Sequence, residues 1–188
     1  MKIAVIGRGN VGGTLGARWS AVGHEVTYGV RRPSALDTAT VREAVAGAEV
    51  VVLAIPGGAA RALLDDLGTE LRGKVVVDTT NDIAGGGKLH ALEELADGAL
   101  PVRAFNTLGW ENFADPVVGG VQADLIYAAE EGRAREVAEE LIRDVGLNPV
   151  CLGGVDAFDV VDSVTRLWFQ LAFRRKLGRR VAFKVLVG

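Results

Sequence analysis

Apolar residues gather along this chain in short continuous runs, separated by glycine-rich turns and amphipathic stretches. Runs such as residues 2–6 and 49–56 lack polar alternation, which is typical of parallel strands buried on both faces. Residues 133–145 instead place apolar side chains at helical spacing and end before Gly146, a common helix terminator. This alternation predicts an α/β fold of the Rossmann type: a doubly wound, mostly parallel sheet with a small C-terminal helical part.

The same patterns set approximate bounds for the individual elements. The predicted strands are residues 2–6, 23–28, 49–56, 74–78, 102–107, 125–129 and 148–152. The predicted helices are residues 11–22, 41–46, 59–67, 88–96, 133–145 and 157–175. The last strand is expected at a sheet edge, because Pro149 cannot donate a hydrogen bond inside a ladder. Residues 85–87 are expected to form a glycine loop over the cleft.

A glycine motif follows the first predicted strand and opens the first predicted helix. It has the spacing GxGxxG and reads Gly7-Arg8-Gly9-Asn10-Val11-Gly12. Gly7 would permit a tight turn, and Gly9 would let a pyrophosphate approach the helix N-terminus. Gly12 would let the helix pack closely on the strand. Strand 23–28 then completes a βαβ unit, so the motif predicts a dinucleotide site. The alternative is a set of glycines that serve only the strand-to-helix turn.

Two adjacent arginines, Arg31 and Arg32, follow the second strand where NAD sites usually carry Asp or Glu. Ser34 adds a hydroxyl group close by. A ribose 2′-phosphate carries nearly two negative charges and fits the planar fork of a guanidinium, so this segment favours NADP over NAD. The alternative is a solvated pair of arginines in a surface loop.

Further candidates for cofactor binding follow later strands, at the edge where doubly wound sheets hold their ligands. They are Ala54, Ile55, Pro56, Thr79, Asn81 and Asn106. The first three would leave room for the cofactor, and the polar ones would orient a nicotinamide amide or a substrate. The alternatives are a plain strand-to-helix corner at 54–56 and an Asx turn with a helix cap at 79–82.

Composition narrows the class of protein. The chain has 188 residues, 49% hydrophobic, which predicts one domain (1–188) with 156–188 as a C-terminal helical segment. With a net charge of -3, the chain has no positive field that would attract nucleic acid or an anionic membrane. Its longest apolar run is too short to span a bilayer. No signal peptide is expected before the first strand. The single Cys151 cannot form an internal disulfide, so a reducing cytoplasm is the predicted location.

The helix predicted at 157–175 carries its polar residues on one narrow stripe. The stripe consists of Asp159, Ser163, Arg166, Gln170 and Arg174. An ordinary surface helix has an apolar face of roughly 100°, and this one is about twice as wide. We therefore expect it to be covered from two directions, by its own domain and by a second subunit or a flat hydrophobic substrate. The alternative is a helix wedged deep in its own fold.

No catalytic side chain is evident, and the catalytic residues stay unassigned. His24 and His90 stand apart from the partners that a triad or a metal site needs, so both are expected to be structural and no metal is predicted. Neither Tyr28 nor Tyr127 is followed four residues later by lysine. Hydride transfer between two ring systems is possible without an acid or base side chain, because the cofactor supplies the reactivity and the protein mainly aligns the two rings.

Beyond the glycine motif, the segments 23–26, 29–32, 55–56, 104–107 and 183–184 form a wider pattern. Together these segments resemble the NADPH-dependent reductases of the 8-hydroxy-5-deazaflavin coenzyme F-420, over the whole length of the chain. The resemblance implies one NADP-binding domain, a deazaflavin lying between the nicotinamide and the loops after the strands, and a homodimer. It also implies which residues hold NADP: Gly9, Asn10, Val11, Arg31 and Arg32.

The predicted function is therefore an NADP-dependent oxidoreductase that transfers a hydride between NADP(H) and a deazaflavin (F-420) or a related flavin-like acceptor. One alternative is an NADP-binding sensor whose C-terminal helix docks a partner. The other is an imine reductase related to pyrroline-5-carboxylate reductase. It is disfavoured because that architecture needs a longer helical dimerisation half than residues 156–188 supply.

Overall fold

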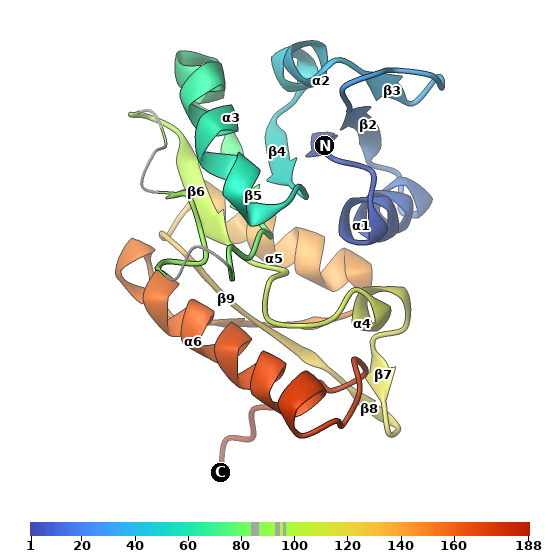
Figure 1. Cartoon of the computed structure of the whole chain (residues 1–188), viewed down its shortest axis with the longest axis vertical. Coiled ribbons are helices and arrows are strands. Elements are labelled where there is room, and N and C mark those ends of the chain that lie inside the picture. Colours follow the sequence, from blue (N-terminus) through green and yellow to red (C-terminus); the bar gives the residue numbers. More distant parts are fainter. Residues whose placement is uncertain (84–86, 93–94, 96) are drawn as a thin grey trace.

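The structure, a computed structural model, describes residues 1–83, 87–92, 95 and 97–188. Strands and helices alternate along most of the chain, as the sequence predicts (Figure 1). The strands are β1 Lys2–Ile6, β2 Glu25–Gly29, β3 Thr38–Ala39, β4 Val50–Leu53, β5 Val75–Asp78, β6 Leu100–Arg103, β7 Val117–Val118, β8 Val121–Gln122, β9 Asp124–Ala129 and β10 Asn148–Cys151. The helices are α1 Asn10–Ala21, α2 Val41–Gly47, α3 Ala60–Leu67, α4 Glu111–Ala114, α5 Arg133–Val145 and α6 Phe158–Phe169. Of the helices described, none is both long and apolar enough to cross a membrane.

Within the described residues, eight strands form one sheet in the order β3-β2-β1-β4-β5-β6-β9-β10. The first six are parallel, whereas β9 pairs antiparallel with β6 and β10 runs parallel to β9. Strand order reverses between β1 and β4, the point where open α/β sheets bind ligands beyond the carboxyl ends of their strands. The predicted doubly wound, mostly parallel sheet is confirmed, and β10 is the edge strand expected from Pro149.

Alternate residues of the parallel strands point to opposite faces of the sheet and build two hydrophobic cores. On one face, Val5 packs with Trp19 of α1 and Leu141 of α5. On the other, Ile6 packs with Leu64 of α3 and with side chains of α2. Because both faces are covered, the strands contain almost no polar side chains, which explains their continuous apolar runs.

The sixth strand ends earlier than predicted. It spans Leu100–Arg103 instead of 102–107, because Phe105 adopts a φ of 60°, in the left-handed region that strands do not use. The ring of Phe105 is buried edge-on against Trp19 and Phe113, with centroid distances of 5.7 and 5.6 Å. This packing holds the strained backbone at Phe105, and the strand ends two residues before it, at Arg103.

Other differences concern short or partly described segments. The four-residue helix α4 and the two-residue strands β7 and β8 were not predicted, because elements of that length show no periodicity. The helix predicted at 88–96 includes residues 93–94 and 96, and the loop at 85–87 includes residues 85–86, which all lie outside the described residues. Within the described part of that helix, residues 88–91 are not helical.

The helix α6 packs on β9 and continues into a π-helical turn at Gln170–Arg174. Its inward face buries Val161 and Trp168. On its outer face, Val160 and Leu167 remain 54% and 49% exposed. The apolar surface of α6 therefore extends beyond the part that its own chain covers, as the narrow polar stripe predicts.

The C-terminal residues return to the start of β9. The backbone N–H of Asp124 donates to the carbonyl oxygen of Phe183 at 2.9 Å, and the Lys184 ammonium lies 2.7 Å from the Asp124 carboxylate. Arg180 binds Asp115, next to α4, at 2.7 Å. These contacts hold the tail against the sheet and fix the residues that precede Arg180.

Substitution of Gly12 tests the contact between α1 and the sheet. A Cβ at Gly12 would lie 3.0 Å from side chains of Ala54 and Val5 and would overlap the carbonyl oxygen of Gly7. We expect Gly12→Ala to lower the free energy of unfolding by about 1–3 kcal/mol. In the control Gly13→Ala, the new Cβ meets only a backbone oxygen at 3.8 Å, so stability should rise by about 0.5–1 kcal/mol. Urea unfolding followed by circular dichroism measures both, and equal effects would contradict this packing.

Candidate functional site

The glycine turn between β1 and α1 has the geometry that a pyrophosphate needs. Gly7 adopts a φ of 101°, and its N–H donates to the carbonyl oxygen of Gly29 at 3.0 Å. Gly9 precedes α1. Among the described residues, no side chain caps this helix, and apart from Gly9 and its two neighbours no atom lies within 4 Å of the position that a Cβ of Gly9 would take. The N–H groups of the first turn and the positive end of the helix dipole thus face open space. The residues present fit the pyrophosphate of a dinucleotide.

Cavity A, of about 620 Å³, lies beside this turn over the ends of β1, β2 and β4. Seven predicted cofactor residues line it: Gly7, Arg8, Gly9, Arg31, Ala54, Ile55 and Pro56. Apolar side chains of Val30, Val41 and Leu63 complete the wall. A mostly apolar wall with cations at its rim suits an adenosine that carries a phosphate.

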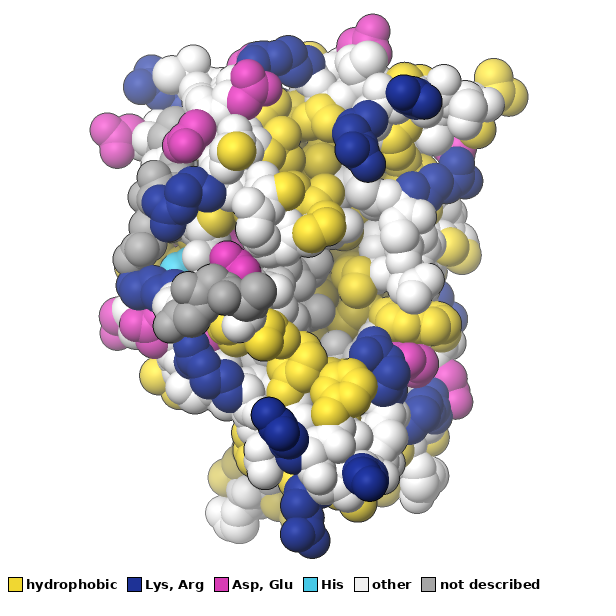
Figure 2. Space-filling model, in the orientation of Figure 1, with side chains coloured by type: hydrophobic (Ala, Val, Ile, Leu, Met, Phe, Trp, Pro, Cys, Tyr) yellow, Lys and Arg dark blue, Asp and Glu magenta, His cyan; other side chains and the backbone are white. Residues whose placement is uncertain are grey.

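Cavity B, of about 480 Å³, lies on the other side of the turn, towards β5. Eight predicted residues line it: Gly9, Asn10, Val11, Ala54, Ile55, Pro56, Thr79 and Asn81. Because Gly9 and residues 54–56 belong to both cavities, the two form one route past the glycine turn. Figure 2 shows a hollow of this kind, with hydrophobic side chains on its walls and Lys and Arg around it.

Arg31 and Arg32 are exposed and together line a further surface hollow of about 510 Å³. In the described part of the chain, neither guanidinium has an ion pair or hydrogen bond. Arg31 also lines cavity A. The arrangement leaves the charge of both side chains available to an anion at the rim of this cavity.

Arg8 is held differently from these two arginines. Its guanidinium lies over the ring of Tyr28, 4.7 Å from the centroid, and donates two hydrogen bonds to the Asp37 carboxylate at 3.0 and 2.8 Å. Asp37 thus neutralises Arg8 in the protein alone. Burial raises the pKa of the Tyr28 hydroxyl, so this ring stays neutral beneath the cation.

Four of the predicted cofactor residues do not line either cavity. Gly12 packs beneath the glycine turn, and the N–H of Ser34 donates to the Thr38 hydroxyl at 3.0 Å within its own loop. The Asn106 side chain is buried and donates to the Thr165 hydroxyl on α6 at 2.7 Å. Arg32 lines only the outer hollow. A cofactor contact of these residues stays a prediction.

A buried arginine supports the wall of cavity B. The Arg103 guanidinium is fully buried and lies 2.7 Å from the Asp162 carboxylate of α6 and 3.4 Å from that of Asp78. It also donates to the carbonyl oxygen of Thr80 at 2.7 Å and to Oδ1 of Asn81 at 3.2 Å. One cation therefore fixes both α6 and the segment that lines cavity B.

The segment after β5 combines the two roles that the sequence left open. Oδ1 of Asp78 accepts a hydrogen bond from the N–H of Thr80 at 2.7 Å, which is an Asx turn. The Thr79 hydroxyl donates to the carbonyl oxygen of Leu53 at 2.8 Å. The turn is thus structural, and it places Thr79, Thr80 and Asn81 at the wall of cavity B.

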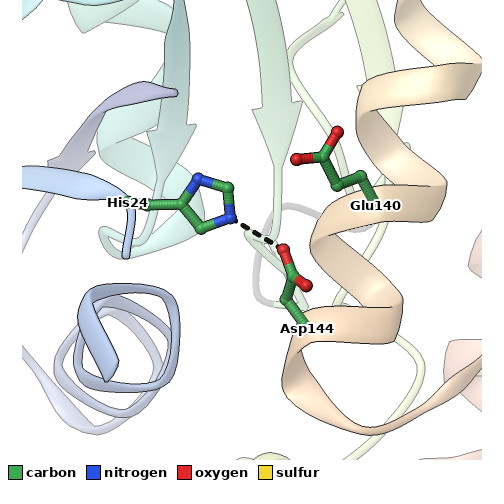
Figure 3. A group of neighbouring side chains, drawn as sticks. All are labelled: His24, Glu140 and Asp144. Carbon is green, nitrogen blue, oxygen red and sulfur yellow. Dashed lines mark hydrogen bonds and ion pairs between the residues drawn. The ribbon is translucent and has the colours of Figure 1, made fainter. Parts of the chain in front are cut away.

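Two groups of His and acidic residues lie within reach of a single ion, outside both cavities. In the first, Nε2 of His24 lies 2.7 Å from Asp144 of α5, with Glu140 one turn away (Figure 3). Nδ1 of His24 lies 3.1 Å from the amino group of Met1. Both ring nitrogens are therefore in use, and the contacts join the first residue to α5.

The second group surrounds His90, which is buried and lies in a non-helical stretch, whereas the sequence predicted a helix over 88–96. Its ring lies edge-on to Phe158, and burial lowers the pKa of His90, so the imidazole is neutral at pH 7. Asp159 lies 3.9 Å away, and Asp162 is already paired with Arg103. A structural role accounts for the contacts of both histidines.

Trp110 and Arg179 also line cavity B, and sequence patterns did not single out either one. Arg179 binds Glu111 at 2.5 Å, and its backbone oxygen accepts a hydrogen bond from Asn112 at 3.3 Å. Both contacts depend on α4 and on the returning tail. The sequence feature that could have identified Trp110 is its position in a loop directly after the predicted strand 102–107.

Residues 2–82 match the family described as coenzyme F420-dependent NADP oxidoreductase. A protein of Methanothermobacter marburgensis named F420-dependent NADP reductase is 27% identical, and the alignment covers 94% of this chain and 95% of that protein. Its namesake from Methanothermobacter thermautotrophicus is 28% identical over 94% and 91% of the two chains. This chain resembles the F420-dependent NADP reductases. The resemblance that the sequence motifs predicted is confirmed.

Solved structures agree with the resemblance to F420-dependent NADP reductases. A candidate F420-dependent NADP reductase from Arthrobacter sp. FB24 superposes with a TM-score of 0.85 at 25% identity, and the match covers 100% of both chains. A Plasmodium falciparum pyrroline carboxylate reductase with NADP bound gives a TM-score of 0.59 at 11% identity, and this chain covers 69% of it. The second likeness shows a shared fold alone.

Removal of the Arg103 guanidinium tests the buried network. Arg103→Met leaves the carboxylates of Asp78 and Asp162 buried without their cation, so we expect the free energy of unfolding to fall by about 3–5 kcal/mol. The control Arg143→Met removes an exposed pair with Glu139 and should cost about 0.5 kcal/mol or less. Chemical unfolding of both variants measures the difference. A loss of similar size in the two would show that the network does not support the fold.

Proposed function

We propose that this protein is an NADP-dependent oxidoreductase that transfers a hydride between NADP(H) and the deazaflavin F420 or a related flavin-like acceptor. The observation that carries the proposal is the continuous route from cavity A, with Arg31 at its rim, to cavity B. It offers a place for a phosphorylated adenosine and a second place for a nicotinamide and its reaction partner. The names of the two Methanothermobacter relatives support the same pair of substrates.

The chain's own residues would bind and align the coenzyme. The first-turn N–H groups of α1 would hold the pyrophosphate, and Arg31 with Arg32 would hold the 2′-phosphate. Ile55 and Pro56 line both cavities and would form the floor under the ribose and nicotinamide. When bound, NADPH supplies the hydride. Close alignment in a cleft from which apolar walls exclude water is the part that this chain contributes.

Asn81 would orient the nicotinamide amide. Its Oδ1 accepts a hydrogen bond from Arg103 at 3.2 Å, and its Nδ2 donates to the carbonyl oxygen of Asn106 at 3.3 Å. The amide plane of Asn81 is therefore fixed before any coenzyme arrives. No side chain is assigned to proton transfer, because hydride transfer between two rings needs none from the protein at this step.

Turnover separates this proposal from its alternatives. Purified protein is mixed with NADPH and oxidised F420, and the absorbance of both is followed. We expect reduction of F420 in proportion to the NADPH consumed. Tight NADPH binding without turnover of any flavin would contradict the proposal and favour a sensor. Turnover with a cyclic imine alone would favour an imine reductase, which the solved structures support only at the level of fold.

The two exposed arginines should determine the preference for NADPH. Charge-assisted hydrogen bonds contribute roughly 1.5–3 kcal/mol each, so we expect Arg31→Ala with Arg32→Ala to weaken NADPH binding by about 2–4 kcal/mol. Binding of NADH should change little, because it lacks the 2′-phosphate. Titration calorimetry with both coenzymes gives the two affinities.

The matched control is Arg143→Ala, which removes an exposed guanidinium on α5 that lines neither cavity. It shows the effect of losing one positive surface charge away from the cavities, against two in the double variant, and should leave both affinities unchanged. If the double variant lost NADPH and NADH affinity equally, the assignment of the 2′-phosphate to this pair would be wrong.

We further propose that residues 1–188 form one NADP-binding domain, that 156–188 serve as its C-terminal helical segment, and that two copies pair through α6 in the cytoplasm. Support for pairing comes from Val160 and Leu167, which are about half exposed, with Val164 and Leu171 between and after them at helical spacing. These four residues form an apolar stripe on α6. In a twofold dimer the apolar stripes of the two copies would pack against each other and become buried.

A charged side chain in the apolar stripe of α6 should prevent the two copies from pairing. We expect wild-type protein to have twice the chain mass of 19.7 kDa, and Leu167→Lys to have the single mass, because a dimer interface would bury a lysine beside its twofold counterpart. Ser163→Lys, on the polar stripe of the same helix, is the control. Light scattering after size exclusion measures both. A wild-type monomer, or two unaffected variants, would contradict pairing through α6.

A further inference from the structure

A third cavity lies where the π-helical turn meets the segment after β5. Cavity C has a volume of about 440 Å³, and Arg166, Phe169, Gln170, Phe173 and Arg174 form its α6 side. Asp82 and Ile83, the next residues after the wall of cavity B, form part of the opposite side. Single π-helical turns of this kind are frequent at functional sites. The cavity therefore adjoins the proposed reaction site but is not part of it.

Aromatic side chains connect cavities B and C. The rings of Phe169 and Phe173 are stacked, 5.5 Å apart with an interplanar angle of 27°, and Phe173 is 47% exposed. The guanidinium of Arg179, which lines cavity B, lies 5.7 Å from the Phe173 ring centre. A large aromatic side chain left this exposed beside a cavity offers a surface for a flat or extended ligand.

The charge of cavity C comes from two arginines and one acidic residue. Within the described residues, the Arg166 side chain makes one hydrogen bond, to the carbonyl oxygen of Gly87 at 3.1 Å. In the part of the chain that the structure describes, Arg174 has no ion pair or hydrogen bond. With Asp82 as the acidic residue on the wall, the balance is positive. Guanidinium groups bind phosphate and carboxylate through paired hydrogen bonds.

We propose that cavity C binds an anionic substituent, phosphate or carboxylate, of the hydride acceptor. The inference rests on the proposed function. The acceptor spans both cavities, with its reacting ring in cavity B, its connecting chain against Phe173 and its anionic group on Arg166 and Arg174. The anionic group sets affinity for the acceptor, while the ring alone takes part in hydride transfer.

The test compares two acceptors on three variants. The acceptors are F420, whose side chain carries phosphate and carboxylate groups, and the neutral deazaflavin alcohol that remains when those groups are removed. The variants are Arg166→Gln, Arg174→Gln and the control Arg175→Gln, an exposed neighbour that does not line the cavity. Equilibrium binding is read from deazaflavin fluorescence, and KM and kcat come from NADPH oxidation.

Each cavity variant should weaken binding of F420 about tenfold, with a matching rise in KM and little change in kcat, since one charge-assisted contact is worth about a factor of ten or more. Affinity for the neutral alcohol and for NADPH should stay the same, and Arg175→Gln should behave as wild type. Equal loss for both acceptors, or no loss for either, would overturn the proposal. Excess inorganic phosphate should weaken F420 binding to wild type and to Arg175→Gln more than to either cavity variant, and an equal effect on all four proteins would also count against the proposal.

Binding and turnover separate this proposal from the function on which it rests. If F420 bound with the arginine dependence above but was not reduced, the anion site would stand and the assigned reaction would fail. If the neutral alcohol were bound and reduced as well as F420, the reaction would stand and the anion site would fail. Absence of binding by either acceptor would overturn both.

Discussion

The buried guanidinium of Arg103 is the contact on which the rest of the site depends. It lies at the end of β6, pairs with Asp162 on α6, and binds the backbone and side chain of the segment after β5. Removing any of these partners would leave a charge or a carbonyl group unpaired in a dry interior, which is costly. The position of α6 over the sheet and the shape of cavity B are therefore not independent features. A single cation sets both.

The glycine turn imposes a second constraint, at the opposite wall of the same cleft. Gly7 has a positive φ and lies against the Ala54 carbonyl group, so β1, α1 and the end of β4 meet without side chains between them. This close approach leaves the start of α1 open to an anion, and residues 54–56 are shared by cavities A and B. The turn and the Arg103 network thus define two walls of one route, with exposed cations at one end and aromatic side chains at the other.

Local sequence predicted the features that depend on neighbouring residues. Continuous apolar runs gave the buried strands, the glycine spacing gave the turn before α1, and the polar stripe of α6 indicated a helix with a second, uncovered apolar side. Features that depend on distant partners were missed. Phe105 leaves the strand because its ring packs against Trp19 and Phe113. Arg103 can be buried because it pairs with Asp162, which lies 59 residues away in the sequence. Trp110 and Arg179 reach cavity B only because the tail returns to α4. None of these contacts has a periodic signal in the sequence.

The central claim is that the chain aligns two rings closely enough for a hydride to pass directly between them. NADPH that carries deuterium at both positions of nicotinamide C4 tests this most directly, in a reaction with oxidised F420 in ordinary water. Direct transfer predicts one deuterium in each molecule of reduced F420, measured by mass spectrometry. Reduced F420 without deuterium would show that the hydrogen passes through solvent or a protein group, and would contradict the account.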